Sequence, residues 1–266
     1  MEINIVWLYP DILNLHGDRG NVMALLKISE AMELPVNLIK VNNADELPDL
    51  EAVDLIVMGA GQLRDIDYVK NDMLKYEEKL RAYAEQDGYI LITGSTGCIF
   101  GSKYYLEDGK EAAGLGIFDM EARALNRTKM PMLTKEVYGD DIYWKTEDGM
   151  EIIGCQIQRM DFKLGGNTKP LGRLVYGYGN NCRDDKEGAR YKNVLFTNTV
   201  GPLLSGNPWF GIKILKEAAA RKGLETAEPD EQKLDYLKMA KHSFALKKTF
   251  IKDKKKLPGI INNIAY

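Results

Sequence analysis

The sequence predicts an α/β protein in three layers, with helices on both faces of a mostly parallel sheet and a helical extension at the C-terminal end. Two observations carry this prediction. In the first hundred residues, short apolar runs without polar alternation take turns with segments of helical spacing, which is typical of parallel strands buried on both faces. The chain also has 266 residues, 45% of them hydrophobic, which is enough for one sizeable core.

The elements of the first half follow one another in regular order. Apolar strands are expected at residues 3–9, 36–41, 53–58 and 89–93. Helices are expected between them, an apolar-striped one at 21–34 and a charged one at 69–86. Since strands joined by helices run in the same direction, these four strands should lie parallel in one sheet.

From about Gly114 the pattern changes to short strands separated by Gly, Asp and Asn turns. These strands are expected at residues 116–121, 136–139, 151–158, 173–178 and 193–198. A helix should follow from Trp209 to Lys222, with Gly223 as its C-terminal cap. We expect residues 1–224 to form one domain and residues 225–266 to form a helical, Lys-rich extension.

Charge and cysteine content exclude several classes of protein. The chain carries 36 basic and 39 acidic residues, with a net charge of -3, so nothing global favours nucleic acid or an anionic membrane. Cys98, Cys155 and Cys182 are widely spaced and fit neither a disulfide framework nor a zinc site. Without a signal peptide or a long apolar run, we expect a cytoplasmic protein with no metal or other cofactor. The basic run Lys247–Lys256 is expected to be solvated, with docking on an acidic partner as the alternative.

Ligands of a parallel α/β sheet collect at the carboxyl ends of its strands. Three loops leave the sheet there, Asp11–Asn21, Gly59–Gln62 and Thr93–Gly97. The last is Gly-rich and opens a helix, so its backbone N–H groups suit an anion or an oxyanion. Taken alone this signal is weak, and a simple tight turn is the alternative interpretation.

Together these segments resemble class I glutamine amidotransferases of the cobyric acid synthase type, and among them the glutaminase subunits of lipid II isoglutaminyl synthase. The resemblance covers about residues 3–225. It rests on LYPDILNLHGDRGN (8–21), Gly59-Ala60-Gly61, ILITGSTGCIFGSKYY (90–105), GLGIFDMEARALNR (114–127), GYGNNCRDDKEGARYKN (177–193) and VGPLL (200–204). It implies a flavodoxin-like class I fold and a Mur-ligase-like, ATP-dependent partner subunit in the amidation of a cell-wall precursor.

The chain departs from the family at the positions where the family has its catalytic residues. The resemblance places Gly94 where the family has its cysteine nucleophile, and Val200 where the catalytic histidine precedes Gly-Pro; Gln158 falls near a further family histidine. Glutamine hydrolysis by this route needs a thiolate to attack the amide carbon and an imidazole to move the proton. No catalytic residue is therefore expected, and the cleft is predicted to hold neither sulfur nor imidazole.

Other matched positions point to substrate binding. Arg127 corresponds to the arginine of the family's Asn-Arg pair and could hold a carboxylate through a bidentate fork, with a surface ion pair as the equal alternative. The turn Gly59-Ala60-Gly61 matches the one that contributes oxyanion-hole amides. Ser95, with Thr96, could contact a ligand, but capping of the following helix is the favoured interpretation.

Two residues could restore activity. Cys98 is the fallback nucleophile, although it lies one helical turn beyond Gly94, and a buried, inert thiol is favoured. His16 lies in the loop after the first strand, where a surface position is favoured over ligand contact. In the same loop Asp18, Arg19 and Asn21 are nearly unchanged from the family pattern, and Arg19 fits a packing role as well as a ligand contact.

Three functions follow from these observations. The first is a degenerate, non-catalytic binding or scaffold subunit whose old pocket binds glutamine or another small carboxylate. The second is an active glutaminase that uses Cys98, an elbow hydroxyl or a partner-supplied base. The third, a nucleotide-binding flavodoxin-like module, is disfavoured because no G-x-G-x-x-G or P-loop follows a strand.

Overall fold

A six-stranded sheet forms the centre of the computed structural model, which describes residues 2–125, 138–230, 233 and 235–254. Its strands are β1 (Ile3–Leu8), β2 (Val36–Val41), β3 (Leu55–Met58), β4 (Tyr89–Thr93), β13 (Ala189–Tyr191) and β14 (Val194–Thr197). They lie in the order β13-β14-β4-β3-β1-β2, and only β13 runs antiparallel to its neighbour. The prediction of a mostly parallel sheet is confirmed.

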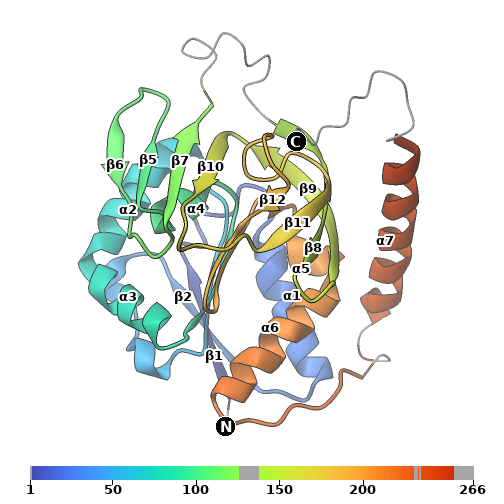
Figure 1. The fold of residues 1–266 in the computed structure, drawn as a ribbon. Coiled ribbons are helices and arrows are strands. Elements are labelled where there is room, and N and C mark those ends of the chain that lie inside the picture. Colours follow the sequence, from blue (N-terminus) through green and yellow to red (C-terminus); the bar gives the residue numbers. More distant parts are fainter. Residues whose placement is uncertain (1, 126–137, 231–232, 234, 255–266) are drawn as a thin grey trace.

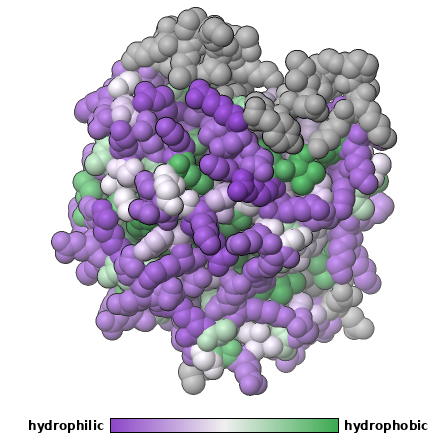
Figure 2. All heavy atoms as spheres, viewed as in Figure 1, coloured by the Kyte–Doolittle hydropathy of each residue, from purple (hydrophilic) through white to green (hydrophobic). Residues whose placement is uncertain are grey.

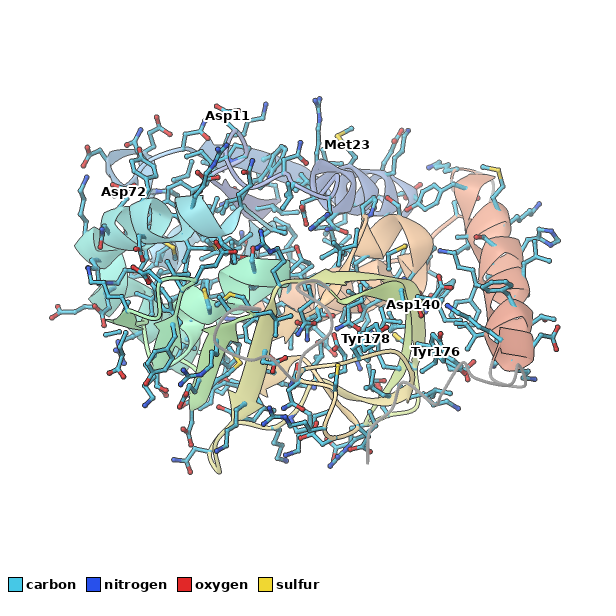
Figure 3. The ribbon with its side chains drawn as sticks, turned by 90° about the horizontal axis from the view of Figure 1, so that it is seen from above. Asp11, Met23, Asp72, Asp140, Tyr176 and Tyr178 are labelled. Atoms are coloured by element: carbon cyan, nitrogen blue, oxygen red, sulfur yellow. The ribbon has the colours of Figure 1, made fainter. Side chains whose placement is uncertain are left out.

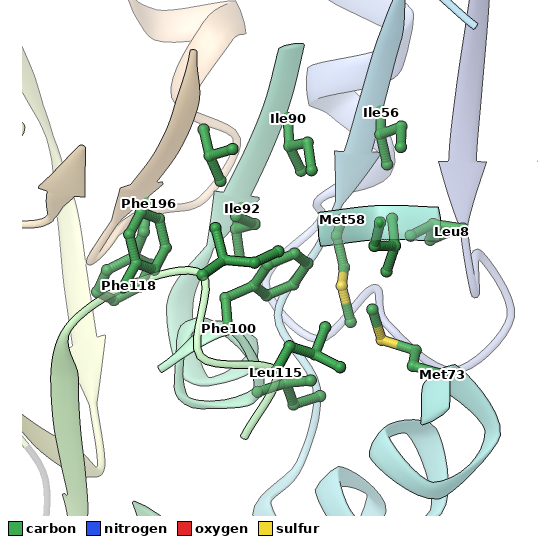
Figure 4. Close-up of a cluster of buried hydrophobic side chains, with 14 of the residues drawn as sticks. Leu8, Ile56, Met58, Met73, Ile90, Ile92, Phe100, Leu115, Phe118 and Phe196 are labelled. Atoms are coloured by element: carbon green, nitrogen blue, oxygen red, sulfur yellow. The ribbon is translucent and has the colours of Figure 1, made fainter. Parts of the chain in front are cut away.

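Helices cover both faces of this sheet, as Figure 1 shows. Two lie on one face, α1 (Arg19–Ala31) and α6 (Pro208–Arg221), and two on the other, α2 (Ile66–Met73) and α3 (Glu77–Glu85). A hydrophobic core lies on each face of the sheet, and single strands contribute side chains to both. In β1, Ile3 and Ile5 belong to the core on the α1 side, while Val6 and Leu8 belong to the core on the α2 side. Figure 4 shows part of the core on the α2 side. The single helix expected at 69–86 is two helices, because the chain turns at the 3₁₀ segment Leu74–Tyr76.

Two smaller sheets occupy the second half of the chain. One has the order β10-β7-β5-β6 and the other β12-β11-β8-β9-β15. Their strands are β5 (Lys103–Tyr105), β6 (Glu111–Ala113), β7 (Met120–Ala124), β8 (Tyr138–Thr146), β9 (Glu151–Gln158), β10 (Met160–Leu164), β11 (Gly172–Tyr176), β12 (Lys186–Glu187) and β15 (Thr199–Val200). The expected strand at 151–158 is confirmed, whereas the one expected at 116–121 begins only at Met120. Shorter helical segments are the 3₁₀ turns 44–46, 50–52, 63–65 and 94–96, with α4 (Gly97–Phe100) and α5 (Leu203–Gly206).

The C-terminal helix α7 (Asp235–Lys254) packs against the five-stranded sheet (Figures 1 and 3). The Phe244 ring lies roughly perpendicular to those of Tyr143 in β8 and Trp209 in α6, with centroids 6.4 and 5.1 Å apart. Lys248 forms an ion pair with Glu151 at 2.6 Å. Lys254 pairs with Asp140, which Figure 3 shows facing the helix. A helical extension is confirmed, but the prediction of a solvated basic run is wrong for these two lysines, because buried apolar residues beside them fix the helix to the sheet.

The face of the molecule seen in Figure 2 is mainly hydrophilic. Figure 2 shows one face covered largely by polar and charged residues, with apolar residues in small, separate patches. Of the helices in the described ranges, none combines the length and the apolar character that crossing a membrane requires.

Candidate functional site

The central strand β4 ends in a sharp elbow at Gly94. This residue has φ +69°, a left-handed conformation that suits glycine and strains other residues. A Cβ added here would lie 2.7 Å from Ala60 Cβ and 3.2 Å from Val200 Cγ1. The chain therefore turns sharply at residue 94, and the space that a side chain there would need is taken by two apolar neighbours.

Val200 reaches the elbow from β15. It pairs with Cys155 across the antiparallel contact between β15 and β9, and it is only 1% exposed. The chain thus brings positions 94 and 200, more than a hundred residues apart, into van der Waals contact range. Neither side chain carries a group that could attack a carbonyl or accept a proton.

The hydroxyl groups of Ser95 and Thr96, in the elbow, form hydrogen bonds with the neighbouring Gly59–Gly61 turn. Ser95 Oγ donates to Gly61 O at 2.6 Å and accepts from Gly61 N at 3.3 Å. Thr96 Oγ1 donates to Gly59 O at 2.9 Å. The favoured capping interpretation is wrong, since α4 has no side-chain cap bond at Thr96. The amide of Gly61, a candidate oxyanion donor, instead points to a serine of the same protein.

The loop after β1 supports the elbow from the other side. Asp18, 2% exposed, accepts from Thr93 Oγ1 at 2.7 Å and from His16 N at 3.3 Å. Asn21 Oδ1 accepts from Leu204 N at 2.9 Å. Arg19 is exposed, and its backbone amide donates to Asn14 Oδ1 at 2.9 Å. The near-unchanged loop therefore serves structure through Asp18 and Asn21.

A cavity of about 340 Å³ opens above Gly94. It is lined by Leu15, His16, Gly61, Gln62, Leu63, Arg64, Gly94, Ser95, Glu107, Ile157, Gln158, Arg159, Met160, Phe162 and Asn198. No cysteine is among the described residues that line it. The imidazole of His16 does line it, so the prediction of a cleft without imidazole is wrong. His16 is half-buried in the cavity wall rather than a surface residue.

The environment of His16 favours its neutral form. Desolvation lowers its pKa below the ordinary 6.5, and the nearby Asp18 carboxylate offsets part of that effect. A neutral imidazole can accept or donate a hydrogen bond to a ligand. Without a thiol beside it, it has no nucleophile to activate.

Residues 4–208 match the model of the CobB/CobQ-like glutamine amidotransferase domain. The chain belongs to this family. Two curated relatives are the lipid II isoglutaminyl synthase (glutamine-hydrolyzing) subunit GatD of Staphylococcus aureus and that of Streptococcus pneumoniae. The first is 32% identical over 231 residues, which cover 86% of this chain and 89% of the relative. The second is 30% identical over 222 residues, which cover 83% and 82%.

Solved structures agree on the class I glutamine amidotransferase fold. A crystal structure of a glutamine amidotransferase superposes with a TM-score of 0.56 at 17% identity, covering 80% of this chain and 98% of that one. The structure of PurLQS from Thermotoga maritima gives a TM-score of 0.52 at 12% identity, covering 83% and 97%. At such low identity these likenesses concern the fold alone.

One residue that the family resemblance singled out, Cys98, lies away from the elbow. Cys98 is fully buried in the core on the α2 side of the sheet. Burial raises the pKa of its thiol, because a thiolate there would be desolvated. Arg127 lies outside the described residues. The structure therefore brings Gly94, Ser95 and the Gly59–Gly61 turn together around the amidotransferase elbow, and keeps Cys98 away from it.

Sequence reasoning missed a buried polar cluster behind the cavity wall. Glu187 is fully buried and accepts from Thr197 Oγ1 at 2.7 Å and from Asn198 N at 2.8 Å. Asn198 Nδ2 donates to Glu187 Oε2 at 3.1 Å and to Asn180 Oδ1 at 2.8 Å. The only sequence signal was the polar run Thr197–Thr199 directly after an apolar strand. One member of this cluster, Asn198, lines the cavity above Gly94, and neither the resemblance nor periodicity indicated it.

Proposed function

We propose that this chain is a glutaminase-like subunit that no longer hydrolyses glutamine and that binds a Mur-ligase-like, ATP-dependent partner in the amidation of a cell-wall precursor. The named role of the two GatD relatives and the family membership support the setting. Because such precursors are built in the cytoplasm, we place the complex there. The subunit would stabilise the partner, which would take free ammonia directly.

One observation carries the non-catalytic part of the proposal. Glycine stands at the elbow, and the methyl groups of Ala60 and Val200 fill the space beside it. A thiolate nucleophile has no place there, and the oxyanion donor Gly61 N already bonds to Ser95 Oγ. Loss of the nucleophile, of the base at position 200 and of a free oxyanion donor removes each of the parts that acyl transfer needs.

The alternative is an active glutaminase that uses Cys98 or a base supplied by the partner. The burial of Cys98 argues against it, since attack requires an accessible thiolate. His16 is the feature in its favour, because an imidazole does face the cavity. It would still need a sulfur that none of the described lining residues provides.

The decisive experiment compares nitrogen sources. The chain is co-expressed with the Mur-ligase-like protein of the same organism, and the purified complex is given ATP and the lipid-linked precursor. We expect the two proteins to co-purify, and amidation to proceed with ammonium chloride but not with glutamine. Glutamine-dependent ammonia release would contradict the proposal, and its disappearance in Cys98→Ala would establish the alternative. Failure of the two proteins to associate would refute the scaffold role.

A further inference from the structure

The outer side of α7 carries a row of exposed apolar side chains. Met239 is 68% exposed, and Leu246 and Phe250 are each 59% exposed. Because an α-helix has 3.6 residues per turn, these three positions form one row along the helix axis. Leu237 and Ile251, which are buried against the body of the molecule, lie on the other side of the helix. The apolar row of Met239, Leu246 and Phe250 therefore faces away from the body.

This concentration of apolar surface is local to α7. Among the described residues, eight large hydrophobic side chains are exposed, and three of them form the apolar row. The other five are distributed over the cavity lining, α1, α2 and the 3₁₀ turn after α2. Single exposed apolar residues are ordinary on a protein surface, whereas an aligned group indicates an interaction site.

The position of α7 limits what can cover the apolar row. Figures 1 and 3 both show α7 at the outer edge of the molecule, beside the five-stranded sheet. In neither view does another described element lie beyond it on that side. The helix is therefore an outward ridge, which a broad, flat surface can reach without meeting the rest of the protein.

The lysines of α7 serve two purposes. The helix carries six lysines and two aspartates. Lys248 and Lys254 form ion pairs with carboxylates of the five-stranded sheet. By helical geometry, Lys238 and Lys252 lie along one side of the apolar row and Lys247 along the other. These three form no ion pair with any residue that the structure describes, so their charge is available to an anionic surface.

Apolar side chains flanked by lysines are typical of helices that lie in a membrane interface. The stem of lysine is long and apolar, so its ammonium group stays among the lipid headgroups while neighbouring apolar side chains enter more deeply. The whole chain has a net charge of -3, and the attraction is therefore confined to this helix. The excess of lysine also disfavours a second copy of α7 as the occupant, because like charges would meet.

A partner helix fits the apolar row less well than a membrane does. His242 and Ser243 are exposed between Met239 and Leu246, so the row is interrupted by polar side chains. A helical seam needs regular apolar positions over about three heptads or more, whereas residues 239–250 cover fewer than two. Lipid chains need no such register, since they adapt to any apolar shape.

We infer that α7 docks this chain on an anionic membrane surface. Met239, Leu246 and Phe250 enter the boundary between headgroups and acyl chains, and the flanking lysines bind headgroup phosphates. Three apolar side chains and three lysines make this contact weak and reversible. The inference goes beyond the proposed function. Only its consequence rests on that function: a subunit that serves amidation of a lipid-linked precursor would be held where the precursor is.

The test measures sedimentation of the full-length chain with vesicles. One set contains phosphatidylcholine alone, and the other contains phosphatidylcholine and phosphatidylglycerol in equal parts. We expect partition into the anionic vesicles to be at least about tenfold stronger, because each lysine near such a surface contributes about fivefold. Added salt should weaken it, since the charges are screened. Equal partition into both sets, or partition into neither, would overturn the inference.

A pair of double variants locates the apolar contact. Leu246→Ser/Phe250→Ser shortens the apolar row, while Met23→Ser/Tyr68→Ser removes exposed apolar side chains from α1 and α2. We expect the first to weaken partition at least about tenfold and the second to change it less than about threefold. Equal effects would show that α7 is not the contact. Circular dichroism checks that each variant is folded, and the comparison of vesicles on the wild type stands if one is not.

Charge reversal tests the lysines. Lys238→Glu/Lys252→Glu changes two that flank the apolar row. Lys79→Glu/Lys163→Glu makes the same change in net charge at exposed positions on α3 and β10. The first should weaken partition into anionic vesicles at least about tenfold, and the second less than about threefold. Equal losses would assign the effect to net charge and overturn the role of α7.

The occupant and the proposed function are tested separately. If Leu246→Ser/Phe250→Ser abolishes binding to the ligase-like partner but leaves vesicle binding unchanged, the apolar row is a protein interface and the inference is wrong. If the wild type does not bind vesicles while its complex with the partner still forms and uses ammonium, only the membrane inference is lost. Ammonia release from glutamine would refute the non-catalytic function whatever the vesicles show.

Discussion

Ala60 and Gly94 lie so close that a Cβ on residue 94 would stand 2.7 Å from the Ala60 methyl carbon. Real Cβ atoms do not approach one another to that distance, so one residue must shift before the other can grow. The methyl group at position 60 and the glycine at position 94 therefore depend on each other. The absence of a side chain at residue 94 and the close approach of Ala60 are therefore linked in the structure.

This relationship predicts that a cysteine at position 94 destabilises the fold. Gly94→Cys should lower the free energy of unfolding by about 1–3 kcal/mol. The new side chain would strain the backbone at φ +69° and would also be too close to Ala60. The double variant Gly94→Cys/Ala60→Gly should recover part of that loss, since the contact is removed and the strain remains. Urea denaturation measures both. A double variant no more stable than the single one would contradict the coupling.

The burial of Cys98 predicts unequal thiol reactivity. Cys155 and Cys182 are partly exposed, whereas Cys98 is fully buried with a raised thiol pKa. In the native protein at neutral pH, a thiol reagent such as DTNB should modify the first two and spare Cys98 until the chain unfolds. Mass spectrometry after alkylation locates the modified residues. Rapid modification of native Cys98, with Cys98→Ala as the control, would revive it as a nucleophile.

Glu187 predicts a pH dependence of stability. Burial raises its pKa above the ordinary 4.5. Between the unfolded and the folded pKa the folded state binds more protons, so the free energy of unfolding falls as pH rises through that window. Below the unfolded pKa the carboxyl is protonated in both states, and above the folded pKa the loss is complete. Glu187→Gln, which does not titrate, should lack this decline.

The measurement is urea denaturation at successive pH values. The unfolding free energy of the wild type minus that of Glu187→Gln should decrease from about pH 4 upward and then level off. Glu225→Gln, at an exposed position, is the matched control. A difference that increases with pH would mean that the folded protein favours the carboxylate, and would reverse our description of the buried cluster.

The fold could be predicted largely from sequence, because the strands of a parallel sheet are continuous apolar runs. The bounds expected for β2 and β4 are those observed. The short strands β5, β6 and β12 were missed, since two or three residues of mixed polarity become strands only through tertiary pairing. The division of the chain at residue 224 stays a prediction.

The site was predictable only in part. The family resemblance gave positions 94 and 200, which the fold brings together at the elbow. It could not give the buried Glu187–Asn198 cluster, because hydrophobic periodicity does not tell which polar residues are buried and paired. Nor could it give the place of His16, since a loop residue faces solvent or cavity according to how the loop packs. The role of Arg127 stays a prediction.

The docking of α7 gives the last prediction. Phe244 packs edge-on against Tyr143 and Trp209, whereas Phe250, on the same helix, is 59% exposed. Phe244→Ala should lower the free energy of unfolding by about 2 kcal/mol, less than the ~3–5 kcal/mol of a fully buried phenylalanine. Phe250→Ala should change it by less than about 0.5 kcal/mol. Both variants delete the same atoms from one helix, so their difference separates packing against Tyr143 and Trp209 from helix propensity. Equal effects in urea denaturation would show that α7 does not dock through Phe244, and would favour an extension that folds independently of residues 1–224.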